Sequence, residues 1–213
     1  MPVYIIMIFV SFVFSLFGLL VKENRLILRF FPVFLFVTLL IEYYSWKLSE
    51  SGKNNIIIYN FFTLAEFIFY LFFLKQVIAK FYRGVNISVI IIVYTVLAGI
   101  NIFFIQGVKT FHTYTYLLGC LLIVIFCIIY FYHLFRSLRS DSLAKESSFW
   151  IITALLFFYA CSLPILGITN FMTGIPSRYY KIMLFTLDFS NVLLYVLFTV
   201  GFICKINFRK LLR

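Results

Sequence analysis

Charged residues are scarce in this sequence. They make up 12% of the 213 residues, and only seven residues are acidic. Disordered chains are rich in charge and poor in aromatic residues, so this composition excludes a disordered protein. Hydrophobic residues instead make up 64% of the chain, and aromatic residues 22%. A soluble protein of this size has too few interior positions to bury so many apolar side chains, and we therefore expect an integral membrane protein.

Cysteine and histidine are rare as well. The four cysteines lie in apolar stretches without CxxC spacing, and His112 and His133 are expected near opposite faces of the membrane. This pattern argues against a disulfide framework and a zinc site. The chain also lacks a GxSxG elbow, an HExxH motif and a glycine-rich phosphate loop. We therefore expect a protein that is not an enzyme and that binds no cofactor or metal.

Long apolar runs are abundant. A transmembrane helix needs about 20 mostly apolar residues, and a transmembrane β-strand only about 10 with strict alternation. The runs here are of the longer kind and are apolar on all sides. They predict an all-α fold, a polytopic membrane bundle of seven transmembrane helices that forms one domain over residues 1–213. The predicted spans are residues 3–21, 26–48, 56–74, 87–106, 113–135, 149–169 and 182–204.

The basic residues are unevenly divided between the two sides of these spans. One side holds 13 of the 18 Lys and Arg residues: Lys22, Arg25, Arg29, Lys75, Lys80, Arg83, Arg136, Arg139, Lys145, Lys205, Arg209, Lys210 and Arg213. Cytoplasmic loops carry the excess of basic residues, so the N-terminus is predicted outside and the C-terminus in the cytoplasm. This distribution accounts for the net charge of +11 without nucleic acid, and the cytoplasmic rim would favour anionic lipid headgroups.

Polar side chains recur at helical spacing inside three of the predicted spans. An ionisable side chain in a span is costly, and polar stripes should face the protein interior, because lipid offers no hydrogen-bond partner. Spans two, three and seven are therefore predicted to face one polar interior. The candidate residues of this polar core or ligand site are Glu42, Tyr59, Thr63, Glu66, Tyr70, Asp188, Asn191 and Tyr195.

Two interpretations of these acids remain open. In one, each carboxyl group is uncharged and hydrogen-bonded to Tyr, Thr or Asn on a neighbouring helix, and serves packing. In the other, Glu66 and Asp188 line an outward-open pocket for a cation, an amine or a proton. The first predicts a structural core, and the second predicts a binding site.

Short stretches of the chain resemble a group of uncharacterised bacterial seven-helix inner-membrane proteins. The similar stretches are residues 59–67 (YNFFTLAEF), Phe149-Trp150-Ile151, and Gly201-Phe202 at the end of the last span. Members of that group are distantly similar to the membrane halves of sensor kinases, although this chain has no kinase domain. The resemblance implies a bacterial inner-membrane location and a sensing or partner role.

We therefore expect a non-enzymatic membrane sensor, scaffold or partner subunit that acts on a membrane protein partner through its short basic cytoplasmic loops. The alternative is a small transporter with a cation- or proton-coupled site at Glu66 and Asp188.

Overall fold

The computed structural model describes residues 1–20, 26–79, 86–136, 146–171 and 176–210. Over these ranges the chain is all-helical, as predicted. The helices are α1 (Val3–Phe17), η1 (Gly18–Leu20), α2 (Leu26–Glu50), α3 (Ile56–Ile78), α4 (Ile87–Ile100), η2 (Asn101–Ile105), α5 (Thr113–Arg136), α6 (Ser147–Phe171) and α7 (Ser177–Lys210). Here η1 is a 3₁₀ turn and η2 is a π-helical segment.

Six helices of the described chain are long and apolar enough to cross a membrane: α2, α3, α4 with η2, α5, α6 and α7. The protein is therefore of the integral membrane type. The predicted first span, residues 3–21, corresponds to α1 and η1, and α1 is only 15 residues long. A seventh span and the orientation of the bundle remain predictions.

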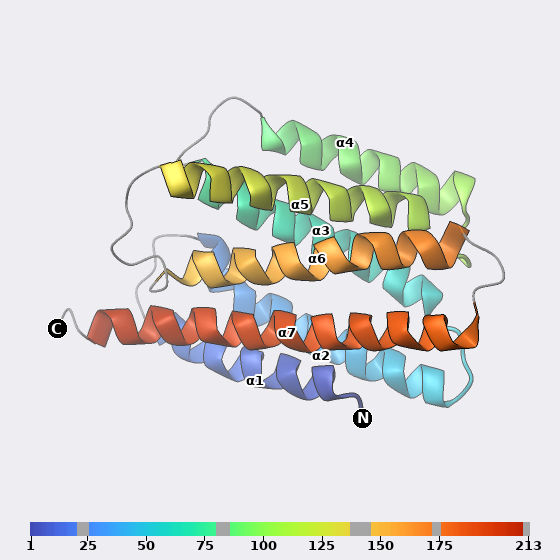
Figure 1. Cartoon of the computed structure of the whole chain (residues 1–213), viewed down its shortest axis with the longest axis horizontal. Coiled ribbons are helices and arrows are strands. Elements are labelled where there is room, and N and C mark those ends of the chain that lie inside the picture. Colours follow the sequence, from blue (N-terminus) through green and yellow to red (C-terminus); the bar gives the residue numbers. More distant parts are fainter. Residues whose placement is uncertain (21–25, 80–85, 137–145, 172–175, 211–213) are drawn as a thin grey trace.

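The helices lie side by side with alternating directions (Figure 1). We call the end of the bundle where α1 begins the N end, and the end where α7 finishes the C end. The connections between α2 and α3 and between η2 and α5 lie at the N end, where α6 also ends and α7 begins. Among the basic residues predicted to be cytoplasmic, Lys22, Arg25, Lys80, Arg83, Arg139, Lys145 and Arg213 lie outside the described residues, as do the side chains of Lys205, Arg209 and Lys210.

Many Ser and Thr side chains satisfy their hydrogen bonds within their own helix. Thr38, Thr153 and Ser162, for example, each donate to the carbonyl oxygen four residues earlier, at 2.7–2.9 Å. Lipid cannot accept these protons, so the nearest backbone carbonyl does. These hydroxyls therefore do not need a partner on another helix.

The C-end half of the bundle is held by aromatic packing. Phe31 of α2 is fully buried and makes edge-to-face contacts with rings of α3 and α7. Its ring centroid lies 5.0–5.7 Å from those of Phe69, Phe73, Phe198 and Phe202. Edge-to-face pairs are favourable because the positive edge of one ring meets the negative face of the other. Together these rings fill the C-end half with apolar side chains.

Candidate functional site

Glu66 lies in the middle of α3, half-buried, beside a group of tyrosines. It interacts electrostatically with tyrosines on all of α3 to α7, which are Tyr70, Tyr94, Tyr116, Tyr159 and Tyr195. All five tyrosines are buried. We refer to Glu66 and these five residues as the tyrosine core.

Three hydroxyl groups of the tyrosine core are buried without a hydrogen-bond partner among the described residues, those of Tyr70, Tyr94 and Tyr159. Tyr70 lies one turn from Glu66 on α3, and its hydroxyl approaches the carboxyl group without reaching hydrogen-bond geometry. Leaving a buried hydroxyl unpaired costs about 1–3 kcal/mol. The core therefore has donors and acceptors to offer to a proton, a small cation or water.

The rings of the tyrosine core are fixed by Phe67, the residue next to Glu66. The Phe67 ring is fully buried, and its centroid lies 5.1 Å from Tyr116, 5.3 Å from Tyr159 and 5.8 Å from Tyr94. Gly119 of α5 lies directly against this ring. The contacts hold three tyrosines of three helices at fixed distances from α3.

A second acidic group lies nearer the N end. Tyr59 of α3 donates a hydrogen bond of 2.9 Å to Glu42 Oε2, and Tyr4 of α1 donates one of 3.3 Å to the same oxygen. Glu42 interacts electrostatically with Glu66, and Asp188 of α7 with Tyr4. Polar groups thus extend from the N end to the middle of the bundle.

Asn60 fixes the connection between η2 and α5 onto α3. Its amide nitrogen donates to the carbonyl oxygens of Val108 at 3.0 Å and Thr110 at 2.8 Å. Its carbonyl oxygen accepts from the backbone nitrogen of His112 at 3.1 Å. Because Asn60 is fully buried, one side chain satisfies three backbone groups that would otherwise lose water.

His112 is also fully buried, between two threonines. Its Nε2 lies 2.6 Å from Thr63 Oγ1, and its Nδ1 lies 2.9 Å from Thr115 Oγ1. Thr63 donates its only proton to the Tyr59 carbonyl oxygen at 2.6 Å, so it accepts from Nε2–H. Burial away from water lowers the pKa of the His112 imidazole to about 4, so the ring is neutral at pH 7.

The π-helical segment η2 brings Asn101 into this network. Its backbone oxygen accepts from the Gln106 nitrogen, five residues on, at 2.9 Å. Its side-chain nitrogen donates to Gln106 Oε1 at 2.7 Å and to Thr115 Oγ1 at 3.1 Å. π-Helical turns are frequent at functional sites. Here the hydrogen bond from Asn101 to Thr115 links the end of α4 to α5.

The structure does not bring all the predicted site residues together in one place. Glu42 and Tyr59 share a hydrogen bond, and Glu66 lies with Tyr70 and Tyr195 in the tyrosine core. Thr63 contacts His112 instead of Glu66. Asn191 is half-buried on α7.

Asp188 differs from the expectation of an inward-facing acid, because its side chain is exposed. Asp188 and Asn191 are three residues apart and therefore lie on one face of α7. Their spacing does not show which neighbouring helices cover that face. At the N end α7 extends past the start of α1, so its first turns have little cover (Figure 1).

Sequence reasoning missed several polar residues that the structure brings together. Asn60 lies between two predicted site residues, Tyr59 and Thr63, and like Thr63 it is hydrogen-bonded to His112. His112 was expected at an interface, whereas it is buried under residues of α3 and α5. The signal available was the cluster of hydroxyl residues around it, Thr110, Thr113 and Thr115.

No protein-family model, curated protein or solved structure matches the chain. The resemblance to bacterial seven-helix membrane proteins therefore stays a prediction. Over the described ranges, no three His, Cys, Asp or Glu side chains lie close enough to hold a metal ion.

Proposed function

We propose that the protein is a non-enzymatic membrane sensor, scaffold or partner subunit, and that a sensor fits the geometry best. Its input site would be the tyrosine core, reached from the N end. Its output would pass through the short basic loops that are predicted to be cytoplasmic, to a membrane protein partner. The N end would face outside and the C end the cytoplasm of a bacterial inner membrane.

The observation that carries this proposal is the division of the bundle into two unlike halves. Polar groups extend from Glu42 and His112 at the N end to Glu66 in the middle. Beyond Glu66 the C-end half is filled by the rings around Phe31. Polar groups on one side of Glu66 and packed rings on the other suit detection of a ligand or a proton better than passage across the membrane.

The alternative is a small transporter coupled to a cation or a proton. It is favoured by the unpaired hydroxyls of Tyr70 and Tyr159 beside Glu66, which could contribute to a binding site. It is weakened by the exposed position of Asp188, the second acid that such a site would use.

Tryptophan fluorescence can test whether the tyrosine core communicates with the C end. The chain has two tryptophans, and Trp46→Phe leaves Trp150 alone near the start of α6. There the β-carbon of Trp150 lies next to Gly201, where α6 and α7 pack together, so its emission should change when the contact between the two helices changes. The Trp46→Phe protein would be compared between pH 5 and 8 with the same chain carrying Glu66→Gln. Glu50→Gln, an exposed acid at the end of α2, is the matched control.

A sensor should show a pH-dependent change in Trp150 emission that is lost with Glu66→Gln and kept with Glu50→Gln. Liposomes containing the protein and a pH-sensitive dye should show no added proton flux. A flux that Glu66→Gln abolishes would overturn the sensor in favour of the transporter. If the emission does not depend on pH in any variant and no proton flux is seen, Glu66 is a packing residue and the protein is a scaffold.

A further inference from the structure

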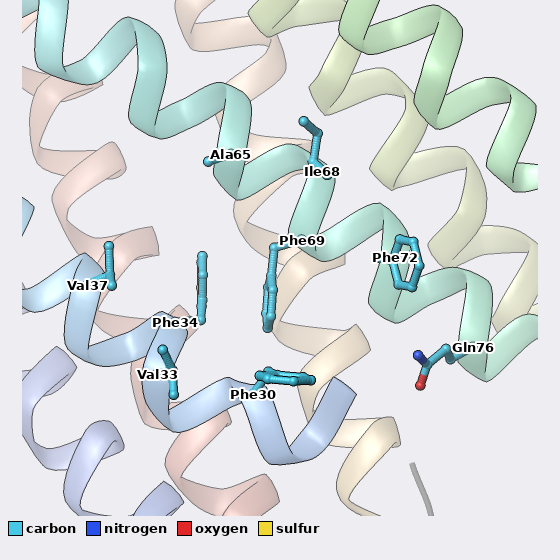
Figure 2. Close-up of a pocket in the computed structure, with 9 residues that line it drawn as sticks. All are labelled: Phe30, Val33, Phe34, Val37, Ala65, Ile68, Phe69, Phe72 and Gln76. Atoms are coloured by element: carbon cyan, nitrogen blue, oxygen red, sulfur yellow. The ribbon is translucent and has the colours of Figure 1, made fainter. Parts of the chain in front are cut away.

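An apolar groove runs between α2 and α3 on the outside of the bundle. Its volume is about 510 Å³. Figure 2 shows four side chains of α2 on one wall, Phe30 to Val37, and five of α3 on the other, Ala65 to Gln76. Apart from Gln76 at one end, the lining is hydrocarbon.

The floor of the groove is a pair of stacked rings. The Phe34 and Phe69 centroids are 4.0 Å apart and the rings are parallel to within 5° (Figure 2). Around this floor Phe30, Ala65 and Phe72 are exposed. In a membrane this surface faces the acyl chains.

The length of the groove corresponds to one leaflet. Ala65 and Gln76 are about 16 Å apart along α3 at 1.5 Å per residue. The hydrocarbon layer is about 30 Å thick, so the groove covers half of it. Ala65 adjoins Glu66 in the middle of α3, and Gln76 lies near the C end.

The C-end mouth of the groove carries positive charge. Lys75 Nζ lies 5.0 Å from the centroid of the Phe72 ring, which lines the groove. Arg29 is exposed and lies one helical turn before Val33, on the side of α2 that lines the groove. Two cations and the amide of Gln76 thus lie where the hydrocarbon region ends.

We propose that this groove binds an anionic phospholipid. One acyl chain lies on the Phe34–Phe69 pair, and the phosphate and its headgroup lie between Arg29 and Lys75. Basic side chains at the end of a groove between membrane helices are a recurrent arrangement for anionic headgroups. A second copy of the chain packed symmetrically on this groove would bring Arg29 and Lys75 of both copies together, and their like charges would repel.

Lipid titration of the purified full chain tests the proposal. Native mass spectrometry would count the molecules of phosphatidylglycerol or phosphatidylcholine, with equal acyl chains, that stay bound in detergent. The variants are Arg29→Gln with Lys75→Gln, which removes the charges, and Ala65→Leu, which narrows the apolar part. Arg136→Gln removes an exposed cation of the C end that does not line the groove, and it is the matched control.

We expect phosphatidylglycerol to bind more tightly than phosphatidylcholine. The double charge variant should weaken phosphatidylglycerol binding by about thirtyfold, with little effect on phosphatidylcholine. Ala65→Leu should weaken both lipids, and Arg136→Gln neither. Equal affinity for the two lipids, or an unchanged affinity in the double charge variant, would overturn the proposal. Dimers cross-linked through cysteines placed at Val33 and Phe72 would overturn it too, because the occupant would then be protein. A thermal melt of each variant separates lost binding from lost folding.

Discussion

Gly119 of α5 lies so close to Phe67 of α3 that a β-carbon at position 119 would be 2.8 Å from the Phe67 ring. Phe67 is fully buried and contacts Tyr94, Tyr116 and Tyr159, so it cannot move aside without disturbing the tyrosine core. The absence of a side chain at residue 119 therefore sets the distance between α3 and α5.

Gly119→Ala should destabilise the protein by about 1–3 kcal/mol, the usual range for overpacking. Thermal unfolding in detergent, followed by circular dichroism, measures the loss. Gly99→Ala is the matched control, because no atom lies within 4 Å of the added carbon, and alanine favours the helix. A Gly119→Ala protein as stable as Gly99→Ala would show that α3 and α5 do not pack this closely.

Asn60→Ala should release the connection between η2 and α5 from α3. The carbonyls of Val108 and Thr110 and the nitrogen of His112 would lose their partner, at about 1–3 kcal/mol for each group that stays buried. Amide hydrogen exchange should become faster at residues 106–112. Asn54→Ala, which removes one exposed bond to the Ile56 nitrogen, should leave that segment unchanged.

Tyr59→Phe should destabilise the bundle more than Tyr4→Phe, because the Tyr59 bond to Glu42 is shorter, 2.9 Å against 3.3 Å. Hydrogen bonds between membrane helices average about 0.6 kcal/mol and reach about 1.7 kcal/mol. A double-mutant cycle with Glu42→Gln gives the coupling energy of each pair. The same coupling for both tyrosines would contradict the geometry.

Lowering the pH below neutrality should destabilise the protein through His112. In the unfolded chain its pKa is about 6.5, whereas burial lowers the pKa of the folded imidazole to about 4. The unfolded state therefore binds more protons between these values, and stability is present above pH 6.5 and lost as the pH falls towards 4.

The full difference is about 3 kcal/mol at 1.36 kcal/mol per pH unit. Melting temperatures measured from pH 7 to 4.5 should fall more steeply for the natural protein than for His112→Gln. Equal slopes would mean that His112 is hydrated in the folded state. His133→Gln, at the end of α5, is the matched control.

Cysteines introduced at Lys53 and Lys109 should react with a membrane-impermeant thiol reagent added to intact cells, and a cysteine at Arg136 should not. The first two positions lie at the N end and the third at the C end. The parent chain controls for the four native cysteines. Labelling of Arg136→Cys alone would reverse the predicted orientation.

Helix positions were predictable from the sequence, because about 20 apolar residues in a row have few alternatives to a membrane helix. The predicted span 56–74, for example, falls within α3, Ile56–Ile78. The length of α1 was less predictable. Its run of apolar residues continues past Phe17, but the regular α-helix ends there and a 3₁₀ turn follows.

The partners of the polar residues were harder to predict. Helical spacing shows which residues share a face, and it places Glu66 and Tyr70 on one face of α3, where the two side chains interact electrostatically. It does not show which helix covers that face, so the electrostatic interaction of Glu66 with Tyr159 and the hydrogen bond of Thr63 with His112 could not be derived. Asn60 was missed for the same reason, since its partners lie in a connection about 50 residues away along the chain.

The two halves of the bundle also differ in the kind of contact that holds the helices together. The hydrogen bonds of Asn60, His112 and Glu42 are directional, and a small sliding movement would break them. The ring contacts around Phe31 depend on how the edge of one ring meets the face of the next, and each contributes only about 0.5–1.5 kcal/mol beyond its buried area. The N end therefore fixes the register of the helices through directional bonds. The C end fixes their spacing through the size of the rings that lie between α2, α3 and α7.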